Sequence, residues 1–343
     1  TYDINHKASV RLAELAKQAG VSRFIFSSSC SYYGAAGDDI LDENAAFNPV
    51  TPYGESKVRV ERDVAPMADD TAVLHFTTWL SPGLPLELFE AIAEHVAGGL
   101  RRRYDVTVES KMSGPLSPED DRFARGTTDI GFICPPSYLW LSEGVNPSVE
   151  LVPLAPVHDD VRNGGRPAYV SDVVVRADAD IGSFADLAGR RIGFNERATL
   201  SGFVSLLSRL DRDGHDVGFL GELRQVGSHH RALSLIESGE IDAAAIDANV
   251  LRAWRATRSD GGRAVRSADV LGPYPIQPVV VRSGAEPGLA AAVAEQLALP
   301  ELVSAIARFG ITGFGPVTHD DYARLGPLVE RANELVPGDS ATA

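Results

Sequence analysis

The sequence has little cysteine, no long apolar run and few basic residues relative to acidic ones, and each scarcity argues against a class of protein. Its 343 residues include only two cysteines, Cys30 and Cys134, which are too few for a disulfide framework or a four-cysteine metal site. No segment reaches the ~18–20 consecutive apolar residues that span a bilayer, so we expect no membrane insertion. The 47 acidic residues outnumber the 32 basic ones, and the net charge of −15 argues against a nucleic-acid partner.

The remaining composition is that of a folded protein with more than one domain. Hydrophobic residues make up 44% and charged residues 23% of the chain, and its length suits two or three domains. Lysine occurs at Lys7, Lys17 and Lys57 near the start and then only at Lys111, whereas every other basic residue is arginine. This skew indicates that the beginning of the chain and its remainder differ in origin.

The first twenty residues read as a polar amphipathic helix, with no apolar core of a signal peptide. If Thr1 lies close to the true start of the protein, the missing export signal favours a cytoplasmic location. We find no internal repeats or low-complexity tracts.

Residues 5–70 carry a group of side chains suited to hydride chemistry. A helix that ends at Gly20 is followed by a predicted strand over residues 23–26 and then by three serines that end at Ser29. Tyr53 and Lys57 are four residues apart and therefore share one face of a helix. A lysine held beside a phenol lowers the pKa of the tyrosine, which can then act as a general base.

This stretch resembles the extended short-chain dehydrogenases, the NAD-dependent sugar-nucleotide epimerases and dehydratases. The resemblance rests on the Phe-Ser-Ser-Ser strand end, on Tyr33-Gly34, and on the Asn-Pro-x-x-Pro-Tyr-Gly-x-Ser-Lys run at residues 48–57. It implies that Ser29 is the catalytic hydroxyl, Tyr53 the general base and Lys57 the residue that holds the nicotinamide ribose.

The segment lacks the part of that family which binds the cofactor. The Gly-x-x-Gly-x-x-Gly phosphate loop and its strands are missing, so nothing receives the pyrophosphate. We therefore expect residues 1–71 to be a truncated, Rossmann-like appendage in which Ser29, Tyr53 and Lys57 are inactive. No cofactor is expected, and NAD would bind only if another chain completed the segment. An NAD-dependent epimerase or dehydratase remnant stays as the alternative function.

From residue 72 onward, predicted strands alternate with helices, which is typical of sheets that bind ligands at the carboxyl ends of their strands. Thr199, Ser201 and Gly202 lie where a helix begins, so free amides and hydroxyls there can receive an anionic oxygen. Ser228 and His229 follow one strand, and Asp247 ends the next, where it can accept from an amine or hydroxyl. Plain helix caps explain Thr199, Ser201 and Asp247 equally well, and His229 can equally be an ordinary loop histidine.

Two chemical alternatives use the same residues. Ser228, His229 and Asp247 form a catalytic triad on paper, but a serine and a histidine adjacent at a strand end usually diverge. A metal site from His229, His230 and Asp247 has no supporting ligand spacing. We therefore expect no metal and no catalysis, and interpret these residues as a binding site.

Residues 74–335 are similar to the phosphate/phosphite/phosphonate substrate-binding proteins of ABC importers. The similarity rests on segments 126–131, 169–176, 186–192, 199–202, 227–229 and 239–247. One departure is Ala198, which stands where the family commonly has serine. The resemblance implies the two-lobed type II periplasmic-binding-protein fold and a cleft that holds the ligand. The ligand-binding residues it implies are Thr199, Leu200, Ser201, Gly202, Ser228, His229, Asp247, Tyr138 and Trp79.

The fold class expected for the whole chain is therefore α/β, with a partial Rossmann-like appendage before a two-lobed binding domain at 72–336. We place lobe one at 73–167 plus 275–335 and lobe two at 168–274, and expect residues 337–343 to be disordered. The resemblance implies a small anionic or zwitterionic ligand, the membrane subunits of an ABC importer as partners, and a periplasmic or extracellular location. A cytoplasmic ligand sensor or an enzyme on the same fold is the other alternative.

Overall fold

The computed structural model divides the chain into two compact units. The first consists of Thr1–Val73 with Ala97–Arg103, and the second of Leu74–Val96 with Tyr104–Ala343. The expected disordered tail at 337–343 lies outside the described residues, and the domain boundaries stay predictions. The structure describes residues 2–19, 21, 24–29, 48–68, 73–81, 83–109, 114–115, 117–143 and 146–336.

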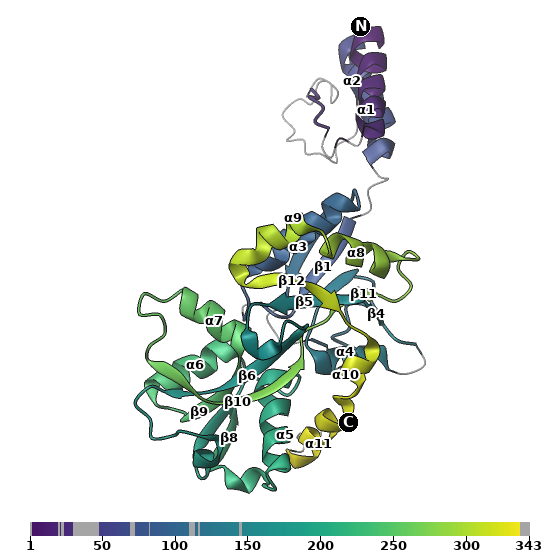
Figure 1. Cartoon of the computed structure of the whole chain (residues 1–343). Helices are drawn as coiled ribbons and strands as arrows, with labels where there is room; N and C mark the ends of the chain where they lie inside the picture. The colour runs from purple at the N-terminus through teal and green to yellow at the C-terminus, as the bar shows by residue number, and fades with distance from the viewer. Residues whose placement is uncertain are drawn as a thin grey trace. The chain divides into compact units, whose positions relative to one another are not determined.

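The N-terminal unit is built on a π-helical turn η1 (Asp3–Lys7) that continues into helix α1 (Ala8–Gln18), and on helix α2 (Pro52–Ala68) (Figure 1). Elements η1 and α1 contact α2, and the Tyr2 hydroxyl donates a 2.6 Å hydrogen bond to Glu55. The predicted strand at 23–26 is wrong for the described residues 24–26, which form a loop. A strand needs a partner for its amides and carbonyls, and none of the described residues of this unit supplies one.

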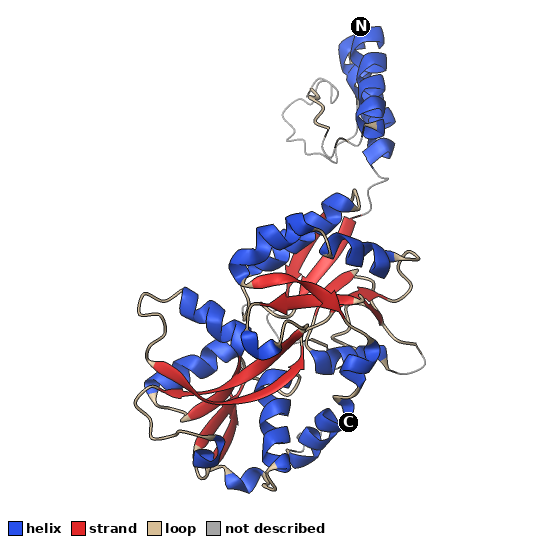
Figure 2. Cartoon of the chain, viewed as in Figure 1, coloured by secondary structure: helices blue, strands red, loops and turns tan. Residues whose placement is uncertain are grey.

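The first lobe of the second unit surrounds a five-stranded sheet in the order β2-β1-β3-β11-β4. Strand β1 pairs in parallel with β3, whereas β11, which comes from late in the chain, runs antiparallel to β3 and β4. Helices α3 (Leu86–Gly99), α8 (Leu289–Leu297) and α9 (Pro300–Ile306) lie against this sheet (Figure 2). The strands are β1 (Val73–Thr78), β2 (Arg103–Val108), β3 (Ile130–Phe132), β4 (Val149–Leu151) and β11 (Val279–Arg282).

The second lobe contains a sheet in the order β10-β6-β9-β7-β8, with helices on both faces. Because side chains alternate along a strand, Val173 and Ala245 pack toward α5, whereas Val174 and Ile246 pack toward α6 and α7. This alternation makes the strands apolar on both faces. The strands are β6 (Ala168–Arg176), β7 (Arg191–Phe194), β8 (Glu222–Gln225), β9 (Ala243–Asp247) and β10 (Val265–Pro275), and the helices are α5 (Ser205–Arg212), α6 (His229–Ser238) and α7 (Ala248–Ala256).

The chain passes between the lobes in two places. The first crossing runs from strand β5 (Leu154–His158) through the short 3-10 turn η3 (Val161–Asn163) into β6, and the second joins β10 to β11. Strand β5 pairs with β12 (Ile311–Pro316), which forms a separate two-stranded sheet. These crossings place the carboxyl ends of several strands of both lobes around one cleft.

The C-terminal helices connect the lobes a third time. Helix α11 (Gly326–Leu335) follows α10 (His319–Ala323) and contacts α4 (Pro135–Ser142) of the first lobe. It also contacts α5 and the π-helical segment η5 (Leu200–Val204) of the second lobe, where Arg331 pairs with Asp211 at 2.9 Å. The helix therefore belongs to neither lobe alone.

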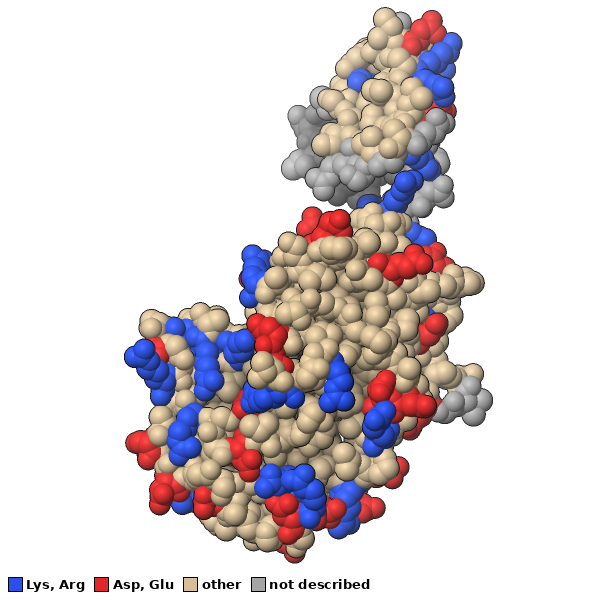
Figure 3. Space-filling view, in the orientation of Figure 1, with Lys and Arg blue, Asp and Glu red and all other residues tan. Residues whose placement is uncertain are grey.

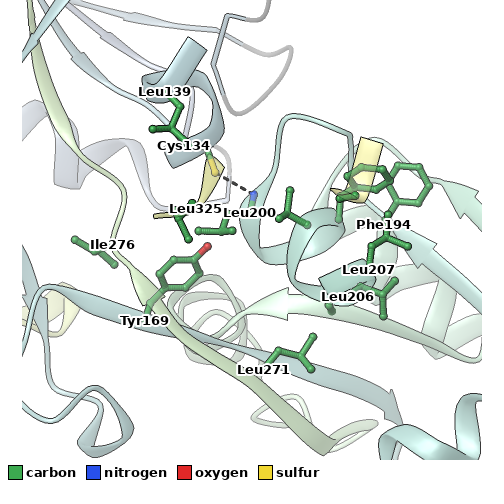
Figure 4. Packing of buried hydrophobic residues seen from close by; sticks show 14 of the residues in the cluster. Cys134, Leu139, Tyr169, Phe194, Leu200, Leu206, Leu207, Leu271, Ile276 and Leu325 are labelled. Carbon is green, nitrogen blue, oxygen red and sulfur yellow. Dashed lines mark hydrogen bonds between the residues drawn. The ribbon is translucent and has the colours of Figure 1, made fainter. Parts of the chain in front are cut away.

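A buried apolar cluster is continuous across both lobes (Figure 4). Cys134 and Leu139 of the first lobe pack near Leu200, Tyr169 and Leu325, and the Leu200 amide donates to the Cys134 sulfur at 3.4 Å. Burial raises the pKa of the Cys134 thiol, which is therefore uncharged. The described contacts between the lobes at this point are thus tightly packed, apolar and uncharged.

No single described helix is long and apolar enough to cross a membrane. Helices Leu289–Leu297 and Pro300–Phe309 pass the test of length and composition only as a pair, with a 64° bend between them.

Candidate functional site

A cavity lies between the lobes, lined by residues of both and by the second crossing. The first lobe contributes Trp79 and the segment that follows it, together with Glu109 and Cys134. The second lobe contributes residues from the ends of β7, β8 and β9, and Gln277 comes from the crossing between β10 and β11. The space that water can enter is about 80 Å³, so the cavity suits a ligand of a few heavy atoms. Much of the remaining wall is formed by Glu196, Ser228, Val250, Leu80, Ser81 and Leu84.

A hydrogen-bonded chain crosses the second-lobe wall of this cavity. Strand β7 ends at Phe194, and Asn195 follows at once with its side chain between Thr199 and His229. The Thr199 hydroxyl donates to Asn195 Oδ1 at 2.6 Å, which turns the Asn195 amide nitrogen toward His229 Nε2 at 3.4 Å. Ser201 Oγ lies 2.9 Å from the same His229 nitrogen. Two donors therefore converge on Nε2, which acts as an acceptor and leaves the ring proton on Nδ1.

His229 is held neutral by its surroundings. Its side chain is 9% exposed, and burial, with a smaller contribution from His230, lowers its pKa to about 3. Its Nδ1 is buried and has no hydrogen-bond partner among the described residues. The neutral imidazole therefore lines the cavity, while its Nδ1 lies buried behind the wall.

The start of η5 is shaped by Gly202, whose backbone lies directly against Asn195. A Cβ added at Gly202 would meet Asn195 Oδ1 at 1.8 Å and Cγ at 2.9 Å. A side chain at this position would push Asn195 away from Thr199 and His229. Gly202 therefore supports the site without lining the cavity.

Asp247 lines the cavity from the end of β9. Its Oδ1 accepts from the Asn249 amide at 2.8 Å and caps α7, while its Oδ2 accepts from Gln277 Nε2 at 2.7 Å. Burial raises the pKa of Asp247 to about 6, although these hydrogen bonds oppose the shift. The two readings of the sequence, cap and cavity residue, both apply to Asp247.

The charged groups of the cavity wall are acidic. Glu109, Glu196 and Asp247 line it, and Arg122 pairs with Glu109 at 2.6 Å. Within the part of the chain that the structure describes, no lysine or arginine lines the cavity. An excess of carboxylate without a lining cation favours a ligand that brings its own positive charge.

The structure brings six of the nine predicted binding residues to the cavity wall: Trp79, Thr199, Ser201, Ser228, His229 and Asp247. Ser228 also caps α6, because its hydroxyl accepts from the Arg231 amide at 3.0 Å. The Trp79 ring stacks on Phe123, which fixes it at the edge of the cavity.

Tyr138, Leu200 and Gly202 are placed behind the wall. Leu200 is buried in η5. The Tyr138 hydroxyl lies 2.9 Å from His319 Nδ1, and its ring packs edge-on against Tyr322. In the described structure, Tyr138 therefore connects α4 to α10 and does not face the cavity.

Eleven of the 17 lining residues were missed by the sequence reasoning, among them Asn195, Glu196, Glu109, Cys134 and Gln277. Asn195 and Cys134 each follow the end of a buried strand, which is a usable signal. Gln277 lies in an irregular crossing and Glu109 after an edge strand, so no pattern along the chain marks them.

The dehydrogenase-like side chains lie in the N-terminal unit. The Lys57 ammonium donates a 2.9 Å hydrogen bond to the Ser27 carbonyl and lies 4.5 Å from the centre of the Phe26 ring. It is 5.5 Å from the centre of the Tyr53 ring, and Tyr53 is 45% exposed. Ser29 is described as part of the loop that precedes the undescribed residues 30–47.

The cleft residues do not form a catalytic triad in the described structure. His229 contacts Ser201 and not Ser228, and neither of its ring nitrogens bonds Asp247. An imidazole with a pKa of about 3 is also a poor base at neutral pH. The described residues contain no group of three or more His, Cys, Asp or Glu that could hold a metal ion.

Comparison with known proteins identifies the larger unit. Residues 81–322 match the family described as "ABC transporter, phosphonate, periplasmic substrate-binding protein". The chain belongs to this family. Its solved relatives in fold include a binding-protein component of an ABC phosphonate transporter from Pseudomonas aeruginosa, with a TM-score of 0.64 and 14% identity over 78% of this chain and 88% of that one.

Two further structures share the same fold. A Prochlorococcus marinus protein in complex with methylphosphonate has a TM-score of 0.63 and 14% identity, and the match covers 76% of this chain and 98% of that one. A Xanthomonas citri protein bound to ATP has a TM-score of 0.58 and 20% identity, over 77% and 98% of the two chains. The predicted type II periplasmic-binding-protein fold of the phosphonate-binding family is thereby confirmed.

The N-terminal unit matches a different family. Residues 1–111 match the NAD dependent epimerase/dehydratase family, as the sequence analysis predicted for residues 5–70. UDP-glucose 4-epimerases from Rhizobium leguminosarum and Lactobacillus helveticus are 38% and 34% identical over 64 residues, which is 19% of this chain. The chain spans about a fifth of the length of these curated relatives. The two family matches overlap at residues 81–111, and within this overlap β2 is hydrogen-bonded to β1 at the edge of the first-lobe sheet.

Proposed function

We propose that this protein is the solute-binding component of an ABC importer and that its cleft binds a small zwitterion with a phosphonate-like anionic end and a cationic amine. The observation that carries the proposal is the composition of the cavity wall, which has three carboxylates and no lining cation among the described residues. The proposed role is binding without chemistry, because the described cleft residues form no catalytic triad and His229, with a pKa of about 3, is a poor general base at neutral pH.

The second-lobe wall supports the anionic end of the ligand. The Ser228 hydroxyl accepts from the Arg231 amide and keeps its own proton for a ligand oxygen, and Ser201 and His229 line the same side of the cavity. The first amide of η5, that of Leu200, donates to the Cys134 sulfur, whereas the Ser201 amide lies at the start of a helix that continues into α5, where amides have no partner within the helix. Neutral donors and a helix start bind an anionic oxygen without a basic side chain.

The carboxylates support the cationic end. Asp247, with its pKa near 6, is ionised at neutral pH, and Gln277 holds one of its oxygens. A dianion alone would meet the ionised Asp247 without a described lining cation beside it, whereas an ammonium pairs with this carboxylate. A hydrogen bond from a charged group contributes about 1.5–3 kcal/mol, or roughly tenfold to a hundredfold in affinity.

The test compares two ligands that differ only in charge. Isothermal titration with 2-aminoethylphosphonate and with propylphosphonate, which replaces the ammonium by a methyl group, measures the contribution of the amine. We expect the amine to tighten binding at pH 7.5 by about tenfold or more. In Asp247→Asn, which retains an oxygen to cap α7, the two ligands should bind with similar affinity.

Asp216→Asn is the matched control, because Asp216 also caps a helix but lies outside the cavity. It should leave the difference between the two ligands unchanged. Equal affinity of the wild type for both compounds, or tighter binding of propylphosphonate, would contradict the zwitterion proposal.

The membrane subunits of an importer are the proposed partners, and the family to which the chain belongs supports a periplasmic or extracellular site of action. The epimerase-like unit enters the proposal as an inactive appendage. Equilibrium dialysis of the full chain with NAD tests this point, and measurable binding would revive the epimerase alternative.

A further inference from the structure

A second and larger cavity lies beside the first crossing between the lobes. The space that water can enter there is about 410 Å³, compared with about 80 Å³ in the cleft. One wall is the crossing itself, with Asp159, Asp160 and Arg162. The opposite wall is the helix α7, with Asn249, Arg252 and Arg255. In Figure 3, basic side chains gather over the region that α7 occupies in Figure 1.

Each carboxylate of this cavity already has a cation. The Arg162 guanidinium bonds Asp160 at 2.6 Å and Asp172 at 2.9 Å, and the hydroxyl of Ser267 also donates to Asp172. Arg252 of α7 pairs with Asp159 of the crossing, so this ion pair joins the two walls. Every carboxylate therefore accepts from a guanidinium, but Arg162 serves both Asp160 and Asp172, so Arg162 and Arg252 leave one negative charge uncancelled.

Arg255 brings the formal charge of the lining to zero, but its hydrogen-bonding capacity is unused in the described structure. Its side chain is half-buried on the cavity wall, and among the described residues no carboxylate or carbonyl oxygen accepts from its guanidinium. The side-chain nitrogen of Asn249, Nδ2, belongs to the same wall. It is buried and likewise has no acceptor in the described part of the chain. The unmatched groups of the cavity are thus donors, and one of them carries a full positive charge.

We infer that this cavity is a second binding site, for a small organic anion whose carboxylate or phosphate group pairs with Arg255. A guanidinium presents two parallel N–H groups that match two oxygens of a carboxylate or phosphate. The volume accommodates a ligand larger than a single anionic group. The site is distinct from the cleft, whose lining contains no arginine among the described residues.

The two cavities share helix α7. Its first turn presents Val250 to the cleft and Ala248 and Asn249 to the second cavity, and its cap is the cleft residue Asp247. The opposite wall of the second cavity is the chain crossing that must bend when the lobes move. A ligand in the second cavity therefore contacts the crossing and also the helix whose cap, Asp247, lines the cleft.

The experiment is a thermal-shift titration of the full chain with inorganic phosphate and, separately, with acetate, at constant ionic strength. We expect a saturable rise in Tm of about 2–4 °C at tenfold excess over Kd for at least one of the two anions. Ser201→Ala, which alters the cleft only, should keep the whole rise. Arg255→Gln should lose it, and Arg255→Lys should retain part of it, since the charge remains but the two parallel donors do not.

Arg263→Gln is the matched control, because it removes the same charge from an exposed position outside the cavity. It should behave as the wild type. The inference is overturned if neither anion gives a saturable shift, if Arg255→Gln keeps the shift, or if Ser201→Ala abolishes it. The last result would assign the anion to the cleft and leave the function proposed for the cleft intact.

Discussion

The two units of this chain differ in how deeply the residues that match their families are buried and hydrogen-bonded. In the phosphonate-binding unit, the residues that match the family are buried, hydrogen-bonded and arranged around a cavity, as Asn195, Ser201 and His229 illustrate. In the epimerase-like unit, Ile4 and Ile25 are 77% and 83% exposed, and the Lys57 ammonium is bonded to a backbone carbonyl. A motif can therefore persist in a sequence while the packing that gives it a function is absent from the described structure.

The sharpest test of this contrast is Gly202→Ala in the phosphonate-binding unit. A Cβ there overlaps Asn195 Oδ1 in a buried site, so we expect the free energy of unfolding to fall by about 3 kcal/mol and ligand binding to be lost. Chemical denaturation measures the first effect and titration calorimetry the second. Gly98→Ala, in a helix with open space around it, is the control and should stabilise by up to about 1 kcal/mol. A fully stable Gly202→Ala variant would show that the site is loosely packed.

A second test uses pH. The pKa of Asp247 is raised to about 6 in the fold, above that of the unfolded chain, so its ionisation destabilises the native state. The stability that depends on the protonated form of Asp247 is therefore fully present below pH 4 and is lost as the pH rises through 6. The free energy of unfolding falls over this range by at most about 3 kcal/mol. Without ligand, Asp247→Asn should be more stable than the wild type at pH 8, and this advantage should vanish near pH 4. Denaturation curves at both pH values decide the matter.

The pH dependence of stability that we expect from His229, in the same cavity, has the opposite sign. Its folded pKa of about 3 lies below that of the unfolded chain, so the stability that depends on its neutral form is lost as the pH falls below about 6.5. His229→Gln should therefore flatten the acid limb of the stability profile. An unchanged acid limb would mean that other groups dominate it.

A smaller effect is expected at the hinge. Arg252 of α7 pairs with Asp159, donates to the Phe309 carbonyl at 2.5 Å and lies 3.1 Å from His158 Nδ1. Because the ion pair is partly exposed, Arg252→Ala should lower the free energy of unfolding by only about 1 kcal/mol. Arg212→Ala, which removes a more exposed arginine from a 3.6 Å pair, should change it by less. Equal effects in urea denaturation would remove any special role for Arg252.

The smallest effect is expected in the N-terminal unit. Tyr53→Phe and Lys57→Met should change neither the main unfolding transition nor ligand affinity, because both residues lie outside the cleft-bearing unit. Calorimetric scans of the full chain measure both quantities. A loss of ligand binding in either variant would abolish the distinction between the two units.

The sequence predicted the second unit well because strand periodicity and strand-end polar residues are local signals. Thr199, Ser201, Ser228, His229 and Asp247 all follow buried strands or begin helices, and all reach the cavity. Tyr138 carries the same kind of local signal, after the end of β3, yet it packs against α10. Which way it points depends on a helix 180 residues later in the chain, and no local pattern contains that information.

The prediction of a strand at residues 23–26 was wrong for a related reason. Residues 24–26 have the apolar composition of a strand, but strand formation requires hydrogen-bonded neighbours that the described residues of this unit do not provide. Glu109, Glu196 and Gln277 were missed because the acidic character of the cleft arises only when β2, β7 and the second crossing meet. Composition along the chain does not encode that convergence.

Helix α11 sets a boundary on how the lobes can move. A hinge with two connecting strands permits rotation about one axis, but α11 contacts α4 on one side and α5 on the other. Any wide opening has to slide this helix off one neighbour or break the Arg331–Asp211 pair. Helix α11 therefore restrains the relative motion of the lobes, and a variant that ends before Gly326 should sample a wider range of lobe angles although every residue of the cavity wall is retained.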